Sequence, residues 1–136
     1  MKIVLNTNVL VSGLLSPYGP PGQIVRMLAA GELTLCHDAR IICEYHDVLA
    51  RPKFPFSPEH VEALLDQIRA AGEPVSTRPL AKRLPDGDDE PFLEVAIAGD
   101  AEHLVTGNPR HYPARCRGGV RVVSPRRFLD CLRADA

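Results

Sequence analysis

The sequence lacks any uninterrupted apolar run that approaches the roughly 18 residues needed for a membrane-spanning helix. Its opening segment, Met1 to Leu5, also lacks the long apolar stretch and the small-residue cleavage site of a secretory signal peptide. These two absences predict a cytoplasmic protein that has no membrane partner.

Cysteine is scarce as well. The four cysteines are scattered and form no Cys-x-x-Cys pair: Cys36, Cys43, Cys116 and Cys131. This spacing provides neither a disulfide framework nor the usual ligand pattern of a structural zinc site. Cys43 and Cys131 stand among apolar residues, so we expect them to be reduced thiols that fill space in the core.

The bulk composition excludes a disordered chain. Hydrophobic residues make up 45% of the sequence and charged residues 24%, which is ordinary for a soluble globular protein. A chain of 136 residues is the size of one domain and can bury one core. Because no repeat, low-complexity segment or long linker divides it, we expect a single domain over residues 1–136.

Charge is distributed unevenly, although the net charge of −1 alone indicates no polyanionic partner. Residues 110–128 contain no acid and six arginines: Arg110, Arg115, Arg117, Arg121, Arg126 and Arg127. Residues 86–94 contain five acids: Asp86, Asp88, Asp89, Glu90 and Glu94. This segregation fits a metal bound at one place with phosphates beside it. On charge alone, two ordinary solvated surfaces are the simpler interpretation.

Strand and helix patterns alternate along the chain. Short apolar runs predict strands over residues 2–5, 33–36, 103–106 and 120–123, with a further short strand near Val75. Capping residues and amphipathic spacing predict helices that begin near residues 9, 22, 38, 57, 89 and 124. This alternation predicts an α/β fold, a single α/β/α sandwich with a central parallel sheet.

Polar residues follow the predicted strands. Asn6 and Asn8 come directly after the first strand, and Thr106 and Asn108 follow the strand over residues 103–106. The acidic cluster precedes a helix. Because ligands of open parallel sheets bind beyond the carboxyl ends of the strands, we expect these side chains to converge at one edge.

Four motifs in order resemble the PIN-domain family. They are Ile3–Ser12 (IVLNTNVLVS), Glu44–Tyr45 in a helix that ends Val-Leu-Ala-Arg-Pro, Leu84–Glu94 (LPDGDDEPFLE) and Val105–Asn108 (VTGN). The resemblance covers essentially the whole chain and is closest to toxin components of toxin–antitoxin systems related to the VapC toxins. It implies a PIN-like sandwich and a metal-dependent endoribonuclease.

The resemblance also implies a set of site residues. Asn6, Glu44, Asp89 and Asn108 match the positions of the four catalytic acids of the family, and Asn6, Glu44 and Asp89 would hold Mg²⁺ or Mn²⁺. Such hard cations prefer oxygen ligands and keep waters, one of which can become the nucleophile.

Further positions would support those ligands. Thr7, Asn8 and Thr106 would brace them. Without the resemblance, Asn8 could simply form a local turn, Asp89 could cap a helix and Glu44 could be solvated.

Two positions depart from the family pattern. Asn6 and Asn108 stand where the family has aspartates, so only two of the four acids are carboxylates. An amide oxygen can ligate Mg²⁺ but brings no negative charge. The alternative hypothesis is therefore a weakened or inactive PIN domain that acts as an RNA- or antitoxin-binding protein.

The resemblance implies macromolecular partners: RNA, a cognate antitoxin protein and a second copy of the chain in a homodimer. Among the basic residues, we expect Arg110, His111, Arg126 and Arg127 to contact RNA phosphates. His111 could also serve only to complete its loop.

Other doubly wound folds with acidic pockets fit less well. A response-regulator receiver needs an early pair of acids and an aspartate after the middle strand. A haloacid-dehalogenase-like phosphatase needs Asp-x-Asp after the first strand, where this chain has Asn6-Thr7-Asn8 and hence no nucleophilic carboxylate.

Overall fold

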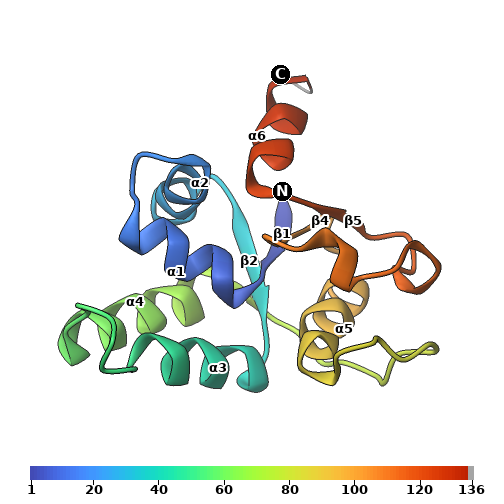
Figure 1. The fold of residues 1–136 in the computed structure, drawn as a ribbon, viewed down its shortest axis with the longest axis horizontal. Coiled ribbons are helices and arrows are strands. Elements are labelled where there is room, and N and C mark those ends of the chain that lie inside the picture. The colour runs from blue at the N-terminus through green and yellow to red at the C-terminus, as the bar shows by residue number, and fades with distance from the viewer. Residues whose placement is uncertain (135–136) are drawn as a thin grey trace.

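A sheet of five parallel strands forms the centre of the computed structural model, which describes residues 1–134 (Figure 1). The strands are β1 (Lys2–Leu5), β2 (Thr34–His37), β3 (Glu73–Pro74), β4 (His103–Val105) and β5 (Arg121–Val123). Their order is β3-β2-β1-β4-β5, so β1 is the middle strand. Ile3, Val4 and Leu5 are completely buried, as expected for a strand covered on both faces.

Helices cover both faces of this sheet. They are α1 (Thr7–Leu15), α2 (Pro20–Ala29), α3 (Ala39–Leu49), α4 (Pro58–Ala71), α5 (Glu90–Ala98) and α6 (Pro125–Ala134). Helix α5 packs against β1, β2 and β4, whereas α1, α2 and α4 lie together on the other side of the sheet (Figure 1). The predicted α/β sandwich with a central parallel sheet is thus confirmed. No helix within residues 1–134 is long and apolar enough to cross a membrane.

Local sequence signals explain most helix starts. Asp38 caps α3 by accepting a hydrogen bond from the Ile41 backbone N–H at 3.0 Å, and Ser57 caps α4 through the His60 N–H at 3.2 Å. Helix α2 begins at Pro20, two residues before the predicted start at residue 22. Proline suits the first turn of a helix because its φ is already helical and its missing N–H needs no partner there.

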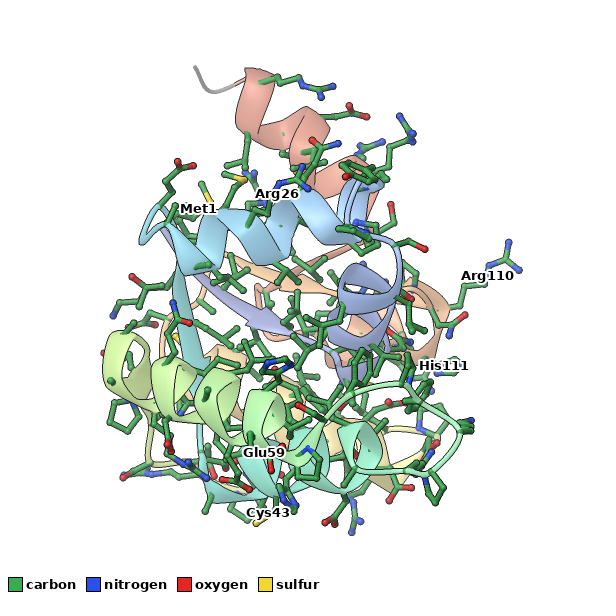
Figure 2. The ribbon with its side chains drawn as sticks, turned by 90° about the vertical axis from the view of Figure 1, so that its left-hand side faces the viewer. Met1, Arg26, Cys43, Glu59, Arg110 and His111 are labelled. Carbon is green, nitrogen blue, oxygen red and sulfur yellow. The ribbon has the colours of Figure 1, made fainter. Side chains whose placement is uncertain are left out.

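The structure corrects the expectation for two cysteines. Cys43 is exposed and Cys131 is half-buried, whereas Cys36 and Cys116 are buried. Figure 2 shows Cys43 at the outer surface of the molecule. Its neighbour Ile42 belongs to the buried stripe of α3, but a rotation of about 100° per residue places Cys43 on the solvent side.

Tyr45 joins α3 to the end of the middle strand. Its side chain is completely buried, and its hydroxyl donates a hydrogen bond to the Leu5 carbonyl at 2.5 Å. Its ring packs against Phe92 of α5 at 6.5 Å between centroids. Tyr45 thereby fixes the position of the α3 residue beside it, Glu44, relative to the end of β1.

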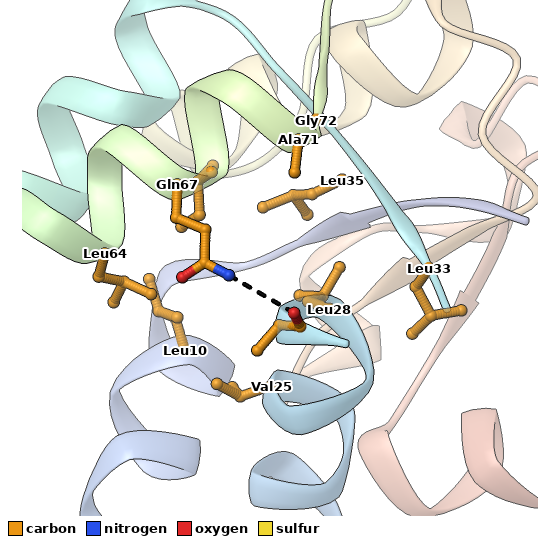
Figure 3. A pocket seen from close by; sticks show the side chains of 11 residues that line it. Leu10, Val25, Leu28, Leu33, Leu35, Leu64, Gln67, Ala71 and Gly72 are labelled. Atoms are coloured by element: carbon orange, nitrogen blue, oxygen red, sulfur yellow. Dashed lines mark hydrogen bonds between the residues drawn. The ribbon is translucent and has the colours of Figure 1, made fainter. Parts of the chain in front are cut away.

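An apolar cleft of about 50 Å³ lies between α2, α4 and β2 (Figure 3). Leu10, Leu28, Leu35 and Leu64 are among its lining residues, and the Gln67 side chain donates to the Ala29 carbonyl at 3.5 Å beside it. Because none of the predicted site residues lines this cleft, it is separate from the candidate site.

We predict that Gly22→Ala destabilises the fold. A methyl group at Gly22 would lie 2.2 Å from the Pro17 carbonyl oxygen, which is backbone and cannot rotate away. The overlap should cost about 1–3 kcal/mol of unfolding free energy, measured by urea denaturation. Gly87→Ala is the matched control, since the nearest atom would lie 3.9 Å from a methyl group added there. Equal stability of the two variants would contradict the prediction.

Candidate functional site

Asn6 lies where β1 ends and α1 begins. It is the N-cap of α1, and its Oδ1 accepts a hydrogen bond from the Asn8 backbone N–H at 3.4 Å. Its Nδ2 donates to the Tyr112 hydroxyl at 2.9 Å, and the residue is 8% exposed. The amide therefore has its oxygen at the start of the helix and its nitrogen directed at a buried phenol.

Thr7 and Glu44 connect α1 with α3. The buried Thr7 hydroxyl donates a hydrogen bond to Glu44 Oε2, and the Glu44 side chain is half-buried. This contact leaves the second carboxylate oxygen of Glu44 without a hydrogen-bond donor among the described residues. Thr7 consequently orients the carboxylate while leaving it one oxygen to ligate a cation.

Asp89 is the last residue of the short 3₁₀ helix η1 (Gly87–Asp89), immediately before α5. It makes no capping hydrogen bond, its side chain is 14% exposed, and its buried Oδ2 has no hydrogen-bond partner among residues 1–134. His111 Nδ1 lies 3.5 Å from this oxygen. Burial, followed by the charge of Asp86, raises the pKa of the Asp89 carboxyl, while His111 acts in the opposite direction.

Tyr112 is a site residue that the sequence analysis missed. Its side chain is completely buried, and its hydroxyl accepts the Asn6 hydrogen bond. Burial raises the pKa of the Tyr112 phenol, and the charges of Asp89 and Glu44 raise it further. Asn6 thus contacts Tyr112 directly, and the charges of Asp89 and Glu44 are near enough to act on its phenol.

The loop after β4 is braced by the predicted supporting residues. Asn8 Oδ1 accepts a hydrogen bond from the Gly107 N–H at 3.4 Å, and Thr106 Oγ1 accepts one from the Asn108 N–H at 3.2 Å. Asn108 itself is exposed. Within residues 1–134 no hydrogen bond joins its side chain to Asn6, Glu44 or Asp89. The structure thus joins Asn6 to Tyr112 and Glu44 to Thr7 by hydrogen bonds, places Asp89 beside His111, and leaves Asn108 exposed on the adjoining loop.

The arginine-rich segment divides into structural and exposed members. Arg117 donates to the carbonyls of Tyr112 and Pro109 at 2.7 and 3.1 Å, so it holds the loop that carries Tyr112. Arg110, Arg126 and Arg127 are exposed. Figure 2 shows Arg110 extending away from the body of the molecule, with His111 closer to it. The exposed guanidinium groups are therefore accessible to a polyanion.

The donor set can hold a hydrated cation but not enclose one. Among the described residues, no three His, Cys, Asp or Glu side chains lie close enough to form a metal cluster. The site does offer the unpartnered Asp89 Oδ2, one Glu44 oxygen and the nearby Asn6 amide. Mg²⁺ commonly binds through one or two carboxylates, keeping waters or substrate phosphates as its other ligands. The residues fit such an ion.

We predict that Asp89→Asn stabilises the protein at neutral pH in the absence of divalent metal. Folding raises the pKa of the Asp89 carboxyl, so the protonated carboxyl favours the folded state. That contribution to stability is lost as the pH rises above 3.8, the ordinary pKa of the group. The stability advantage of the variant should grow from about pH 3 to about pH 7, as measured by denaturation in EDTA.

Glu32→Gln, which removes an exposed carboxylate, is the control and should show no such growth. A constant difference between Asp89→Asn and the unaltered protein across this range would show that folding does not disfavour the Asp89 charge.

Comparison with known proteins identifies a family and solved structures of similar fold. Residues 2–110 match the family model of the PIN domain. No curated protein matches the sequence. The crystal structure of VapBC2 from Rickettsia felis bound to a DNA fragment from its promoter contains a similar fold, with a TM-score of 0.61 and 18% identity over 91% of this chain and 98% of that one. Since the family match spans most of the sequence, the chain belongs to the PIN domain family.

Proposed function

We propose that this protein is a Mg²⁺- or Mn²⁺-dependent endoribonuclease that serves as the toxin of a toxin–antitoxin pair. The observation that carries the proposal is the Asp89 carboxylate. Its side chain is 14% exposed, and its buried Oδ2 has no hydrogen-bond partner among the described residues of a chain that belongs to the PIN domain family. Burial raises the pKa of this carboxyl, and Asn6, at the end of the middle strand, is close enough to lower it. A carboxylate oxygen that is buried without a hydrogen bond costs stability, and a cation would offset that cost.

The site residues would divide the chemistry. Asp89, Glu44 and the Asn6 amide would hold the ion, which supplies an activated water and neutralises charge on the phosphodiester. Thr7 keeps the Glu44 carboxylate oriented, and Tyr112 fixes the Asn6 side chain. His111, 3.5 Å from Asp89, stands where the loop after β4 would meet the RNA backbone. Asn108, exposed on that loop, would lie within reach of the same strand.

A specific observation supports a second candidate function. Asn6 donates its amide N–H to Tyr112, and its closeness to Asp89 helps to lower the pKa of that carboxyl. A hydrogen-bond donor thus partly performs the task of a cation. In this second function, the domain would keep its RNA- and antitoxin-binding surfaces but would cleave RNA inefficiently.

An antitoxin and a second copy of the chain are the proposed protein partners. The support is the fold shared with VapBC2, which was crystallised as a complex. An antitoxin could inhibit the enzyme by placing a basic side chain against Asp89 and Glu44, where it would replace the metal. Cytoplasmic RNA would be the target in its absence.

We predict that Asn6→Asp increases both metal affinity and ribonuclease activity. A third carboxylate adds a direct charge to the ion, so Mg²⁺ or Mn²⁺ should bind about tenfold more tightly or better by calorimetry. In EDTA the same variant should be less stable than the unaltered protein, because it loses the donor to Tyr112 and adds charge beside Asp89. Added Mg²⁺ should remove this deficit.

Gln67→Glu is the matched control, since it makes the same amide-to-carboxylate change at an exposed position of α4 outside the candidate site, where it should change Mg²⁺ affinity and the stability in EDTA little. RNA cleavage is compared with and without the metal for all three proteins. Metal-independent cleavage would refute the proposed ion site. Equal Mg²⁺ affinity of the unaltered protein and of Asn6→Asp would refute it as well. Metal-stimulated cleavage by the Asp variant only would favour the second candidate function.

We predict that Arg126→Ala/Arg127→Ala weakens RNA binding evenly across sequences and lowers its salt dependence. Phosphate contacts release counterions and carry little sequence information, so the slope of log K against log[salt] should fall by about 2 in magnitude. The control is Arg115→Ala/Arg121→Ala, which removes two other exposed arginines of the same segment. Identical affinities and slopes for both double variants would assign Arg126 and Arg127 no particular role.

A further inference from the structure

A polar pocket lies between residues 18–23, where α2 begins, and one side of α6. Its volume is about 220 Å³. Its lining residues are Tyr18, Gly19, Pro20, Gln23, Arg126, Leu129, Asp130 and Arg133. None of them is a candidate metal ligand. Helices α2 and α6 pack against each other here (Figure 1). The pocket therefore has walls from two separate parts of the chain.

Tyr18 gives the pocket an unusual aromatic wall. The residue is 89% exposed, whereas the other two tyrosines, Tyr45 and Tyr112, are completely buried. It is the most exposed large hydrophobic residue of the described chain. An accessible aromatic ring beside cationic groups is the arrangement by which proteins hold single-stranded nucleic acid, because every base can stack on it.

The facing wall carries the charge. Arg126 and Arg133 are two turns apart on α6 and are both exposed, while Leu129 between them is 8% exposed and forms an apolar floor. Asp130 lies 3.7 Å from Arg133 and offsets part of its charge. The pocket thus combines a stacking surface with a net positive wall.

The pocket adjoins the edge of the sheet where the candidate metal site lies. The Thr106 N–H donates to the Val123 carbonyl at 2.9 Å, so β5 ends level with the loop after β4. Helix α6 begins two residues later, which places Arg126 in its first turn near that edge.

We infer that this pocket is a nucleotide subsite for single-stranded RNA, outside the bond that is cleaved. One base stacks on Tyr18, and its phosphate lies between Arg126 and Arg133. The inference rests on the proposed RNA-binding function and adds to it a binding element that does not involve metal. It predicts that a flexible, unpaired strand is favoured over a duplex, whose bases cannot leave their own stack.

Tyrosine fluorescence provides a direct test because the chain has no tryptophan and only Tyr18 is exposed among its three tyrosines. The protein, kept in EDTA to prevent cleavage, is titrated with a single-stranded oligouridylate and with an oligomer of the same length that has abasic sugars. We expect the oligouridylate to quench the accessible tyrosine signal and the abasic oligomer to bind more weakly without quenching it.

Two pairs of variants complete the test. Tyr18→Ala should weaken oligouridylate binding about 5- to 100-fold, whereas Tyr18→Phe should bind within about twofold of the unaltered protein. Asp130→Asn should strengthen binding, because it frees Arg133 from its ion pair. The control Asp66→Asn breaks the equivalent ion pair with Arg69 on α4 and should leave binding unchanged.

The outcomes separate the two proposals. If the unaltered protein binds RNA but Tyr18→Ala and Asp130→Asn bind as it does, the subsite is refuted and the proposed RNA-binding function stands. If the unaltered protein binds no RNA in EDTA, the subsite is refuted together with metal-independent RNA binding. Equal binding of oligouridylate and the abasic oligomer would show that the pocket contacts only phosphates, and it would overturn the proposed base stacking.

Discussion

The middle position of β1 constrains the rest of the molecule. Parallel strands need long crossover connections, so helices must cover both faces of the sheet, and every strand then ends at the same edge. The carboxyl ends of β1, β4 and β5 are joined there by backbone hydrogen bonds from the Asn6 N–H to the Val105 carbonyl and from the Thr106 N–H to the Val123 carbonyl, both at 2.9 Å. The buried Tyr45 hydroxyl adds α3 to this edge through a strand carbonyl. Polar side chains distant in sequence are consequently fixed within a rigid frame.

Electrostatics at this edge are unbalanced when no cation is bound. Asp89 is held away from water without a full set of hydrogen bonds, and a second carboxylate, Glu44, acts on the same buried phenol of Tyr112. Stability alone would favour replacing such a carboxylate by a neutral group. Its presence beside a neutral Asn6 points to a task other than folding. Burial raises the pKa of the Asp89 carboxyl, and its Oδ2 remains available to a ligand.

Sequence patterns predicted the strands and helices well, because capping residues and apolar periodicity favour the same elements that the fold requires. The caps of α3 and α4 and the buried apolar run of β1 formed as expected. The patterns failed where burial depends on tertiary packing. Tyr112 lies in a polar, proline-containing loop whose sequence gives no sign of burial, yet Arg117 folds that loop back onto the site by bonding two of its carbonyls. The resemblance proposed Asn6, Glu44 and Asp89 by position. It could not reveal that Asp89 leaves one oxygen without a hydrogen bond, since a residue before a helix usually uses its carboxylate as a cap.

A site with only two carboxylates also links metal and RNA energetically. Under the proposed function, a hard cation that takes few ligands from the protein must complete its shell with water and with phosphate oxygens of the substrate. The RNA would therefore bind more tightly when the ion is present, and by thermodynamic reciprocity the ion would bind more tightly when RNA is present. In a four-carboxylate site the ion would be held by the protein alone and this coupling would be smaller. Under the proposed function, Asn6 would therefore shift part of the metal binding from the protein to its substrate, and RNA contacts away from the cleaved bond would become more important to the reaction.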